Sequence, residues 1–320
     1  MFRAFALAAA LTTSSACLAE EVWPTQQVRL IVPYAAGGTT DYLGRLAAEH
    51  ISRVTGQSVI VENRTGAGGN IGADIVAKSA PDGRTIAMVT NGVLTVNQFI
   101  YRKMPFDPNK DLVTAAILGE APQVVVTPKS FPADTMKDFI AYAKANPGGI
   151  NYGTAGVGSS NHLSALQLER IAGIKLTHVP YRGAAPAVTD LTTAHIQMMS
   201  VGVAPVISLV EAGQLKLIAA TTKERMPQLP DLPTATEAGA PGYESTTWFG
   251  IIAPAATPEP ILRRINEHMR TLLDRPDVQK VFRDQYLVAW RMNLAETRKH
   301  VIDETAMWGK LIREAGIKLD

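Results

Sequence analysis

Two stretches of the sequence place glycines and hydroxyl side chains directly after an apolar run. They cover residues 33–41 (PYAAGGTTD) and 152–162 (YGTAGVGSSNH). An amphipathic helical pattern follows each stretch, so each turn is predicted to open a helix N-terminus. Unpaired backbone N–H groups and the helix dipole attract anions there, and glycines let an anion approach the backbone closely. Two such turns favour one anion shared between them, although ordinary turns capped by Thr40, Asp41, Ser159 or Ser160 would use the same residue types.

A third glycine-rich turn, residues 66–72, resembles a nicotinamide-cofactor loop, but its third glycine stands one position too late for that motif. We therefore expect backbone packing at this turn and no cofactor. The sequence contains neither a G-x-S-x-G nor an H-E-x-x-H motif, and its histidines show no metal-ligand spacing. Ser159 and His162 are candidates for a nucleophile and a base, but they lack a supporting third residue. These features favour a binding protein over an enzyme and predict no metal site.

The charge balance and the first residues bear on partners and location. With 31 Lys and Arg against 29 Asp and Glu, the net charge of +2 provides no basic field for nucleic acid. Residues 1–19 combine a basic head at Arg3, an apolar run and small residues up to Ala19, which is the layout of a secretory signal. We expect cleavage after Ala19, which would remove Cys17, the single cysteine, and leave a periplasmic monomer.

The elements that must position the two turns alternate along the chain. Strands are predicted at 28–32, 58–61 and 85–89, and in a second block at 124–126, 151–153, 177–179, 196–201 and 215–221. Helices are predicted at 41–54, 71–80, 133–145, 162–172, 260–273 and 295–315, the last with a capping box formed by Asn293 and Glu296. Strands separated by helices predict parallel pairing, and therefore an α/β fold.

Six ordered motifs carry a family resemblance that extends over nearly all of the chain after residue 19. They cover residues 31–41, 61–72, 81–83, 152–163, 178–183 and 248–254. In these motifs the chain resembles the extracytoplasmic solute receptors of tripartite tricarboxylate transporters, the Bug-type receptors. The resemblance implies a type II periplasmic-binding-protein fold, in which two α/β lobes with mostly parallel sheets hold a ligand in the cleft between them. Lobe 1 would comprise 20–121 and 226–320, and lobe 2 would comprise 122–225, with a strand near 247–253 as a candidate to cross to lobe 2.

The same resemblance implies a set of ligand-binding positions. In one lobe these are Tyr34, Ala36, Gly37, Gly38 and Thr39, together with Asp41 as a cap or polar contact. In the other lobe they are Thr154, Ser159 and His162, with His162 equally open to a structural role. Tyr181 and Gly183 would form the cleft wall, and Asn91 would also face the cleft.

The implied function is capture of a small organic carboxylate, either a di- or tricarboxylate or an aromatic acid, by hinge closure. Delivery to the membrane permease subunits of a transporter would follow. Two other functions fit the same cleft. One is that of an exported hydrolase or lyase that acts on a carboxylate there, and the other is that of a ligand-sensing receptor. Val201 is a departure, because many receptors of this family carry an acidic residue there; its absence favours an acid without an ammonium group, or else reflects packing alone.

Overall fold

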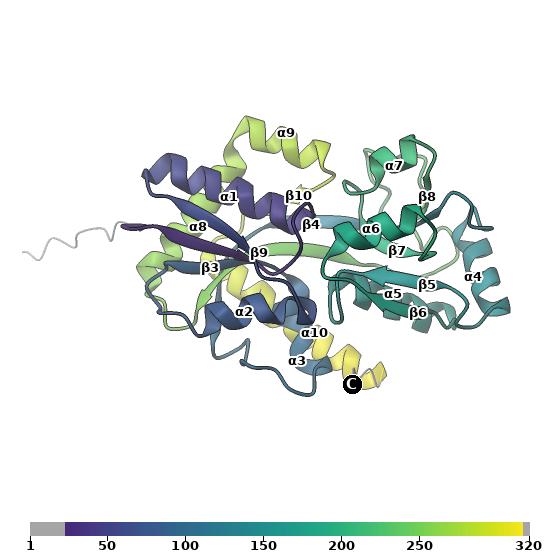
Figure 1. Cartoon of the computed structure of the whole chain (residues 1–320), viewed down its shortest axis with the longest axis horizontal. Coiled ribbons are helices and arrows are strands. Elements are labelled where there is room, and N and C mark those ends of the chain that lie inside the picture. The colour runs from purple at the N-terminus through teal and green to yellow at the C-terminus, as the bar shows by residue number, and fades with distance from the viewer. Residues whose placement is uncertain (1–22, 316–320) are drawn as a thin grey trace, which may run out of the picture.

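The computed structural model of the chain describes residues 23–315, so the predicted signal segment 1–19 lies outside the described residues. Two α/β lobes lie side by side, joined by the strands β4 (Leu112–Pro128) and β9 (Thr246–Pro254) (Figure 1). Within the described residues, every helix is too short or too polar to cross a lipid bilayer.

The first lobe is built on β1 (Val28–Val32), β2 (Val59–Asn63) and β3 (Thr85–Thr90). Both β2 and β3 pair with β1 in parallel, as the alternation of strands and helices predicts. The helices α1 (Thr39–Thr55) and α2 (Asn70–Ala77) make the crossovers. Short helical turns η1 (Ala67–Gly69), η2 (Gly92–Val96) and α3 (Asn97–Ile100) continue this lobe toward its neighbour.

The strands β4 and β9 run antiparallel to each other and to their other neighbours. β9 lies between β3 and the first half of β4, while the second half of β4 pairs with β7 (Met199–Gly202) and β8 (Leu215–Ala220). The sheets are therefore mixed where these two strands cross between the lobes. Only residues 124–126 of β4 are predicted from the sequence, because the strand is buried on both faces and lacks the alternation that marks a half-buried strand.

The second lobe contains the parallel pair β5 (Asn151–Thr154) and β6 (Thr177–Pro180). Its helices are α4 (Met136–Ala145), α5 (Ser160–Ala172), α6 (Ala184–Thr192) and α7 (Ile207–Glu211). α6 immediately follows Gly183 and is absent from the sequence prediction.

The last elements return to the first lobe (Figure 1). They are α8 (Glu259–Asp274), α9 (Pro276–Asp284), β10 (Val288–Ala289) and α10 (Leu294–Ala315). The predicted capping box of α10 is confirmed: the Glu296 carboxylate accepts from the Asn293 N–H at 2.8 Å, and Asn293 Oδ1 accepts from the Glu296 N–H at 3.0 Å.

The apolar cores follow the lobes. One cluster of buried side chains contains Leu30, Ile51, Ala121 and Phe249. Val125 and Tyr243 belong to a second cluster, and Val124 belongs to a third. The change between clusters along β4 therefore falls between Ala121 and Val124. The exact lobe boundaries at 121 and 225 stay a prediction.

Candidate ligand-binding site

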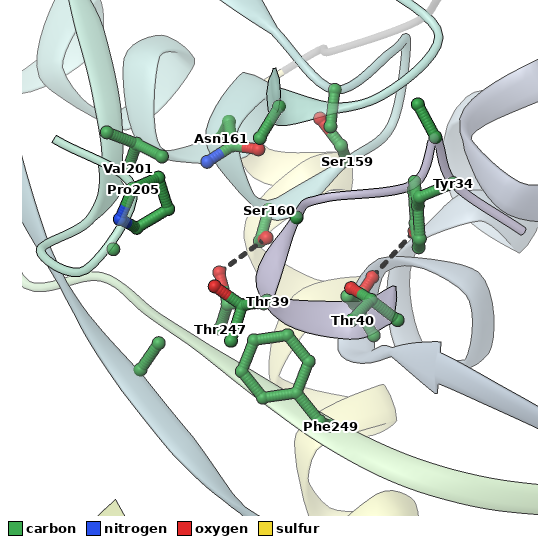
Figure 2. Close-up of a pocket in the computed structure, with 17 residues that line it drawn as sticks. Tyr34, Thr39, Thr40, Ser159, Ser160, Asn161, Val201, Pro205, Thr247 and Phe249 are labelled. Carbon is green, nitrogen blue, oxygen red and sulfur yellow. Dashed lines mark hydrogen bonds between the residues drawn. The ribbon is translucent and has the colours of Figure 1, made fainter. Parts of the chain in front are cut away.

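A hollow of about 530 Å³, its open mouth included, lies where the two lobes meet (Figure 2). Its lining comes from both lobes and from the crossing strands. The lining residues are Tyr34, Ala35, Gly38, Thr39, Thr40, Thr90, Ala121, Ala155, Ser159, Ser160, Asn161, Ala184, Val201, Gly202, Pro205, Thr247 and Phe249.

None of these described lining residues carries a charged side chain. Polar atoms come from seven hydroxyls, one amide and the backbone: the side chains are Tyr34, Thr39, Thr40, Thr90, Ser159, Ser160, Thr247 and Asn161. The remaining side chains are small or apolar, with Val201 and Phe249 the bulkiest aliphatic and aromatic members. An anion in this hollow would therefore be held by N–H and O–H donors and by helix dipoles rather than by an ion pair.

The N-terminus of α1 reaches the hollow through Gly38, Thr39 and Thr40. Gly38 is the N-cap in extended geometry, and no described side chain caps this end, so the backbone donors of the first turn lack side-chain partners. Gly37 differs, because its N–H donates to Asp41 Oδ2 at 3.2 Å. Ala36, Gly37 and Asp41 consequently lie outside the lining, in contrast to the expectation of direct contact.

Asp41 shapes the turn and lies outside the lining of the hollow. Its carboxylate is buried and accepts from Arg45 Nε at 3.0 Å and from Asn63 Nδ2 at 2.9 Å, besides the Gly37 N–H. Burial alone would raise the pKa of Asp41, but the hydrogen bonds from Arg45, Asn63 and Gly37 outweigh it and hold the pKa below its ordinary value. Asp41 therefore braces the turn through the Gly37 N–H, makes no cap hydrogen bond to the first turn of α1, and lies outside the lining of the hollow.

The N-terminus of α5 faces the same hollow through Ser159, Ser160 and Asn161. Ser159 is the N-cap residue, but no side-chain cap hydrogen bond forms there among the described residues. Its buried Oγ likewise finds no hydrogen-bond partner within residues 23–315. An unpaired buried hydroxyl is costly, so a ligand that pairs with it would recover that free energy.

A third helix N-terminus reaches the hollow and is missed by the sequence prediction. Ala184, the first residue of α6, lines the hollow, and Gly183 is its N-cap. The order of strand β6, Gly183 and helix α6 repeats the order of strand, glycine and helix seen at the first two turns. This repetition is the signal in the sequence that could have identified the third helix N-terminus. Gly183 itself lies against the backbone of Ala35, which a Cβ on Gly183 would approach to 2.8 Å.

His162 and Thr154 support the α5 turn from behind rather than lining the hollow. His162 Nδ1 accepts from the Gly158 N–H at 3.2 Å, and its ring stacks on His178 at 4.1 Å. The Thr154 hydroxyl pairs with His178 Nε2 at 2.7 Å. Burial lowers the pKa of His162 to about 3 and that of His178 to about 4, so both rings are neutral near pH 7.

The two tyrosines expected at the cleft are placed differently. Tyr34 lines the hollow, and its hydroxyl pairs with Thr90 Oγ1 at 2.7 Å, while burial raises the pKa of Tyr34 to about 12. Tyr181 lies outside the lining, and its hydroxyl donates to Asp190 at 2.6 Å. Asn91 also lies outside it, and its amide donates toward the Thr246 carbonyl and Glu304.

Five predicted positions thus line the hollow: Tyr34, Gly38, Thr39, Ser159 and Val201. The sequence prediction misses the contributions of Thr247 and Phe249, because β9 brings them from a distant part of the chain. It also treats Thr40 and Ser160 as caps only. Val201 lies on β7, where an acidic side chain would face the hollow.

The two lobes touch beside the hollow through polar contacts. The Ala35 N–H donates to the Arg182 carbonyl at 3.1 Å, and the Tyr101 hydroxyl donates to the Val157 carbonyl at 2.6 Å. A Cβ on Gly68 would lie 2.0 Å from the same Val157 oxygen. We call these contacts the interlobe seam, and they hold the two lobes in contact in this structure.

Comparisons with known proteins agree with this arrangement. The family model described as the tripartite tricarboxylate transporter family receptor matches residues 43–317. A structure from R. palustris with adipate is 36% identical, with a TM-score of 0.89 over 93% of this chain and 100% of that one. The periplasmic binding protein BugD is 31% identical, with a TM-score of 0.87 over 93% and 100% of the two chains. MatC from Rhodopseudomonas palustris with bound malate is 31% identical, with a TM-score of 0.86 over 91% and 100%. The expected two-lobed α/β fold of periplasmic binding proteins is confirmed.

Proposed function

This chain belongs to the tripartite tricarboxylate transporter receptor family, and we propose that it captures a small organic carboxylate between its lobes for delivery to membrane permease subunits. The family is one of periplasmic binding proteins rather than of enzymes. For this chain we further propose export by the segment 1–19 and action as a monomer.

The observation that carries the proposal is the convergence of three helix N-termini on a hollow without charged side chains. The first residues of α1, α5 and α6 all line it. Each N-terminus offers free N–H groups and partial positive charge, so together they favour one negatively charged group over a cation or a neutral molecule.

The remaining lining favours a short aliphatic acid with a second polar end. Ala121, Val201, Pro205 and Phe249 offer apolar surface, while Thr90 offers a hydroxyl beyond the helix N-termini. Two relatives are solved with dicarboxylates, one with adipate and one with malate. We therefore propose a dicarboxylate without an ammonium group as the ligand class, since this lining provides no carboxylate to receive one.

Ligand capture by hinge closure is supported by the position of the site. The donors belong to both lobes, so the complete set exists only when the lobes meet at the interlobe seam. The connecting strands β4 and β9 give a continuous, paired link about which the lobes would open. A ligand that binds the closed form better shifts the equilibrium toward it.

The proposal is tested by calorimetry on the purified chain with adipate, malate, benzoate and aspartate, combined with chromatography of each mixture for product. We expect a dissociation constant on the order of micromolar or tighter for a dicarboxylate, weaker binding of aspartate, and no product. Steady product formation would overturn the receptor proposal. Tight binding of aspartate with no binding of either dicarboxylate would overturn the ligand class.

A further inference from the structure

A buried chain of side-chain hydrogen bonds leads from the wall of the hollow into the second lobe. It links residues on α5, β9, β4 and β7 and ends at a buried tyrosine. In order from the hollow, the members are Ser160, Thr247, Gln123, Ser200, Ser164 and Tyr243, with successive distances of 2.6, 2.6, 2.7, 2.7 and 2.7 Å. Figure 2 shows its outer end, the hydrogen bond between Thr247 and Ser160.

The amide of Gln123 gives this chain a direction. Its Oε1 accepts from the Ser200 hydroxyl, and its Nε2 donates to Thr247 Oγ1. Because an amide has a distinct donor end and acceptor end, the two neighbours cannot exchange roles without a rotation of the amide. Thr247 Oγ1 is therefore an acceptor toward Gln123, and it uses its single hydrogen to donate to Ser160 Oγ.

Because the hydrogen bonds run toward Ser160, the hydroxyl hydrogen of Ser160 is available to an acceptor in the hollow. A serine hydroxyl carries one donor, and Ser160 already accepts from Thr247. No hydrogen bond donated by Ser160 occurs within residues 23–315, and Ser160 lines the hollow. A hydroxyl that accepts one hydrogen bond donates a stronger one, so the chain prepares Ser160 as a donor.

Gln123 itself is fully buried and is not part of the lining. Its place is fixed by β4, where its carbonyl accepts from the Thr221 N–H at 2.9 Å. On the far side, Asn161 Nδ2 donates to the Ser200 carbonyl at 2.6 Å and ties β7 to the α5 N-terminus. Gln123 can therefore act on a ligand only through Thr247 and Ser160.

We propose that Gln123 is a positioning residue that holds the Ser160 hydroxyl as a hydrogen-bond donor toward a carboxylate in the hollow. This inference rests on the proposed function, because it names how that site selects an acceptor. It goes further in assigning specificity to a buried amide that touches no ligand. Reversal of the chain would present a lone pair to the hollow and would favour a donor such as an ammonium group.

The test is a double-substitution cycle measured by calorimetry with adipate as the probe. We expect Ser160→Ala to weaken binding about tenfold to a hundredfold, the effect of losing a charge-assisted hydrogen bond. Gln123→Met, which keeps the side-chain size, should weaken binding about threefold to tenfold. In the Ser160→Ala background, Gln123→Met should add less than about twofold, because the two residues act in series.

Two further variants separate positioning from folding. Thr247→Ser keeps the hydroxyl and should retain adipate binding, whereas Thr247→Val should weaken it at least as much as Gln123→Met does. The matched control is Gln167→Met on α5, whose amide contacts Gly242 away from the hollow and should leave binding unchanged. Additive effects of Ser160→Ala and Gln123→Met, or unchanged binding in Gln123→Met, would overturn the inference. If the unaltered chain binds neither adipate nor malate, the proposed ligand class fails instead.

Discussion

At the scale of single residues, the site relies on groups without net charge. Hydroxyls and backbone N–H groups line the hollow, and the nearest carboxylate of the α1 turn, Asp41, is turned toward Arg45 and Asn63. Such donors are already oriented by the helices, so little ordering is required when a ligand binds. Selectivity for an anion then depends on keeping negative charge out of the lining.

Val201→Asp tests this dependence. The new carboxylate would face the hollow from β7 and repel a bound acid, so we expect adipate binding to weaken at least about tenfold. Calorimetry on the variant measures the change. Val201→Asn has the same shape without the charge and serves as the control; equal losses in the two variants would refute an electrostatic cause.

The buried histidines make stability depend on pH. The pKa of His162 lies at about 3 in the folded chain, below its ordinary value of 6.5, because burial disfavours the charged ring. Below about pH 6.5 the unfolded chain therefore takes up a proton that the folded chain does not, and stability falls as pH decreases toward about 3. His178 and His50, each with a pKa of about 4, act in the same direction.

Replacing His162 should weaken this dependence. In His162→Gln the side chain keeps an acceptor for the Gly158 N–H but cannot be protonated. The loss of unfolding free energy between about pH 6.5 and pH 4.5 should shrink, by up to about 1.4 kcal/mol per pH unit. Urea denaturation at several pH values measures it. His195→Gln, at an exposed histidine, is the control, and an equally reduced slope there would contradict the assignment.

At the scale of elements, the α1 turn depends on one carboxylate that ties a helix to a strand. Asp41 on α1 is 6% exposed in its side chain and bonds both Arg45 and Asn63 of β2. Asp41→Ala would leave the Asn63 amide and the Gly37 N–H without this acceptor. We expect a loss of about 1–3 kcal/mol in unfolding free energy together with weaker adipate binding, since the turn no longer holds its shape.

Denaturant unfolding and calorimetry on the same preparation check both parts of this prediction. The control is Asp284→Ala on α9, which removes an i,i+4 ion pair with Lys280 whose side chains are more than half exposed. Exposed pairs of this kind contribute little, so the control should change stability by less than about 0.5 kcal/mol. A loss in Asp41→Ala no larger than in the control would contradict the role of Asp41.

Elements with a clear local pattern could be predicted from the sequence. β1 is predicted at its observed bounds, and α5, α8 and α10 begin within two residues of the prediction, because each has an apolar periodicity and a marked start. Elements defined by distant partners could not be predicted from local pattern. The strand near 247–253 is expected only through the family resemblance, and it forms as β9 by pairing with β3 and β4. The sequence prediction misses α6, which has nine residues and a proline at its third position.

The same division holds for the site. The helix N-terminus pattern identifies the two turns that contain Gly38, Thr39 and Ser159, whereas the family resemblance names these residues as ligand-binding positions. His162 and Thr154 stand in the right turn, but which side of a turn a side chain occupies depends on the packing behind it, here the rings of His178 and Tyr152. Thr247 and Gln123 join the site through sheet register, which the sequence of either strand does not reveal.

At the scale of the whole molecule, the interlobe seam explains the third glycine-rich turn. Gly68 has φ +61°, and its Cα faces the Val157 carbonyl of the other lobe. The space between them is too small for a Cβ. The expected backbone packing in residues 66–72 is therefore packing between lobes at Gly68, whereas Gly66, Gly69 and Gly72 pack within the first lobe. Gly68 and Gly92 of the first lobe and Gly156 of the second let the backbones approach to contact distance.

Gly68→Ala is predicted to oppose closure. Its Cβ would lie 2.0 Å from the Val157 oxygen, so the lobes would close less completely and adipate binding should weaken at least about tenfold. Gly173→Ala is the matched control, because Gly173 also has φ +61° but a Cβ added there would meet no atom within 4 Å. Both variants place an alanine at φ +61°, so the part of the loss in unfolding free energy that comes from backbone strain should be alike.

Small-angle scattering with saturating adipate supplies a second measurement. The unaltered chain and Gly173→Ala should contract on adding adipate, whereas Gly68→Ala should contract less. Equal binding and equal contraction in the two glycine variants would show that the seam does not control closure.

Because the donors are divided between α1 on one lobe and α5 and α6 on the other, parting the lobes separates the donors from one another without moving any side chain. A bound acid would then keep only part of its partners and meet water on its other side. We expect the residence time of the acid to be set by how often the lobes part. A membrane partner that separates the lobes would then release the ligand without competing for its polar contacts.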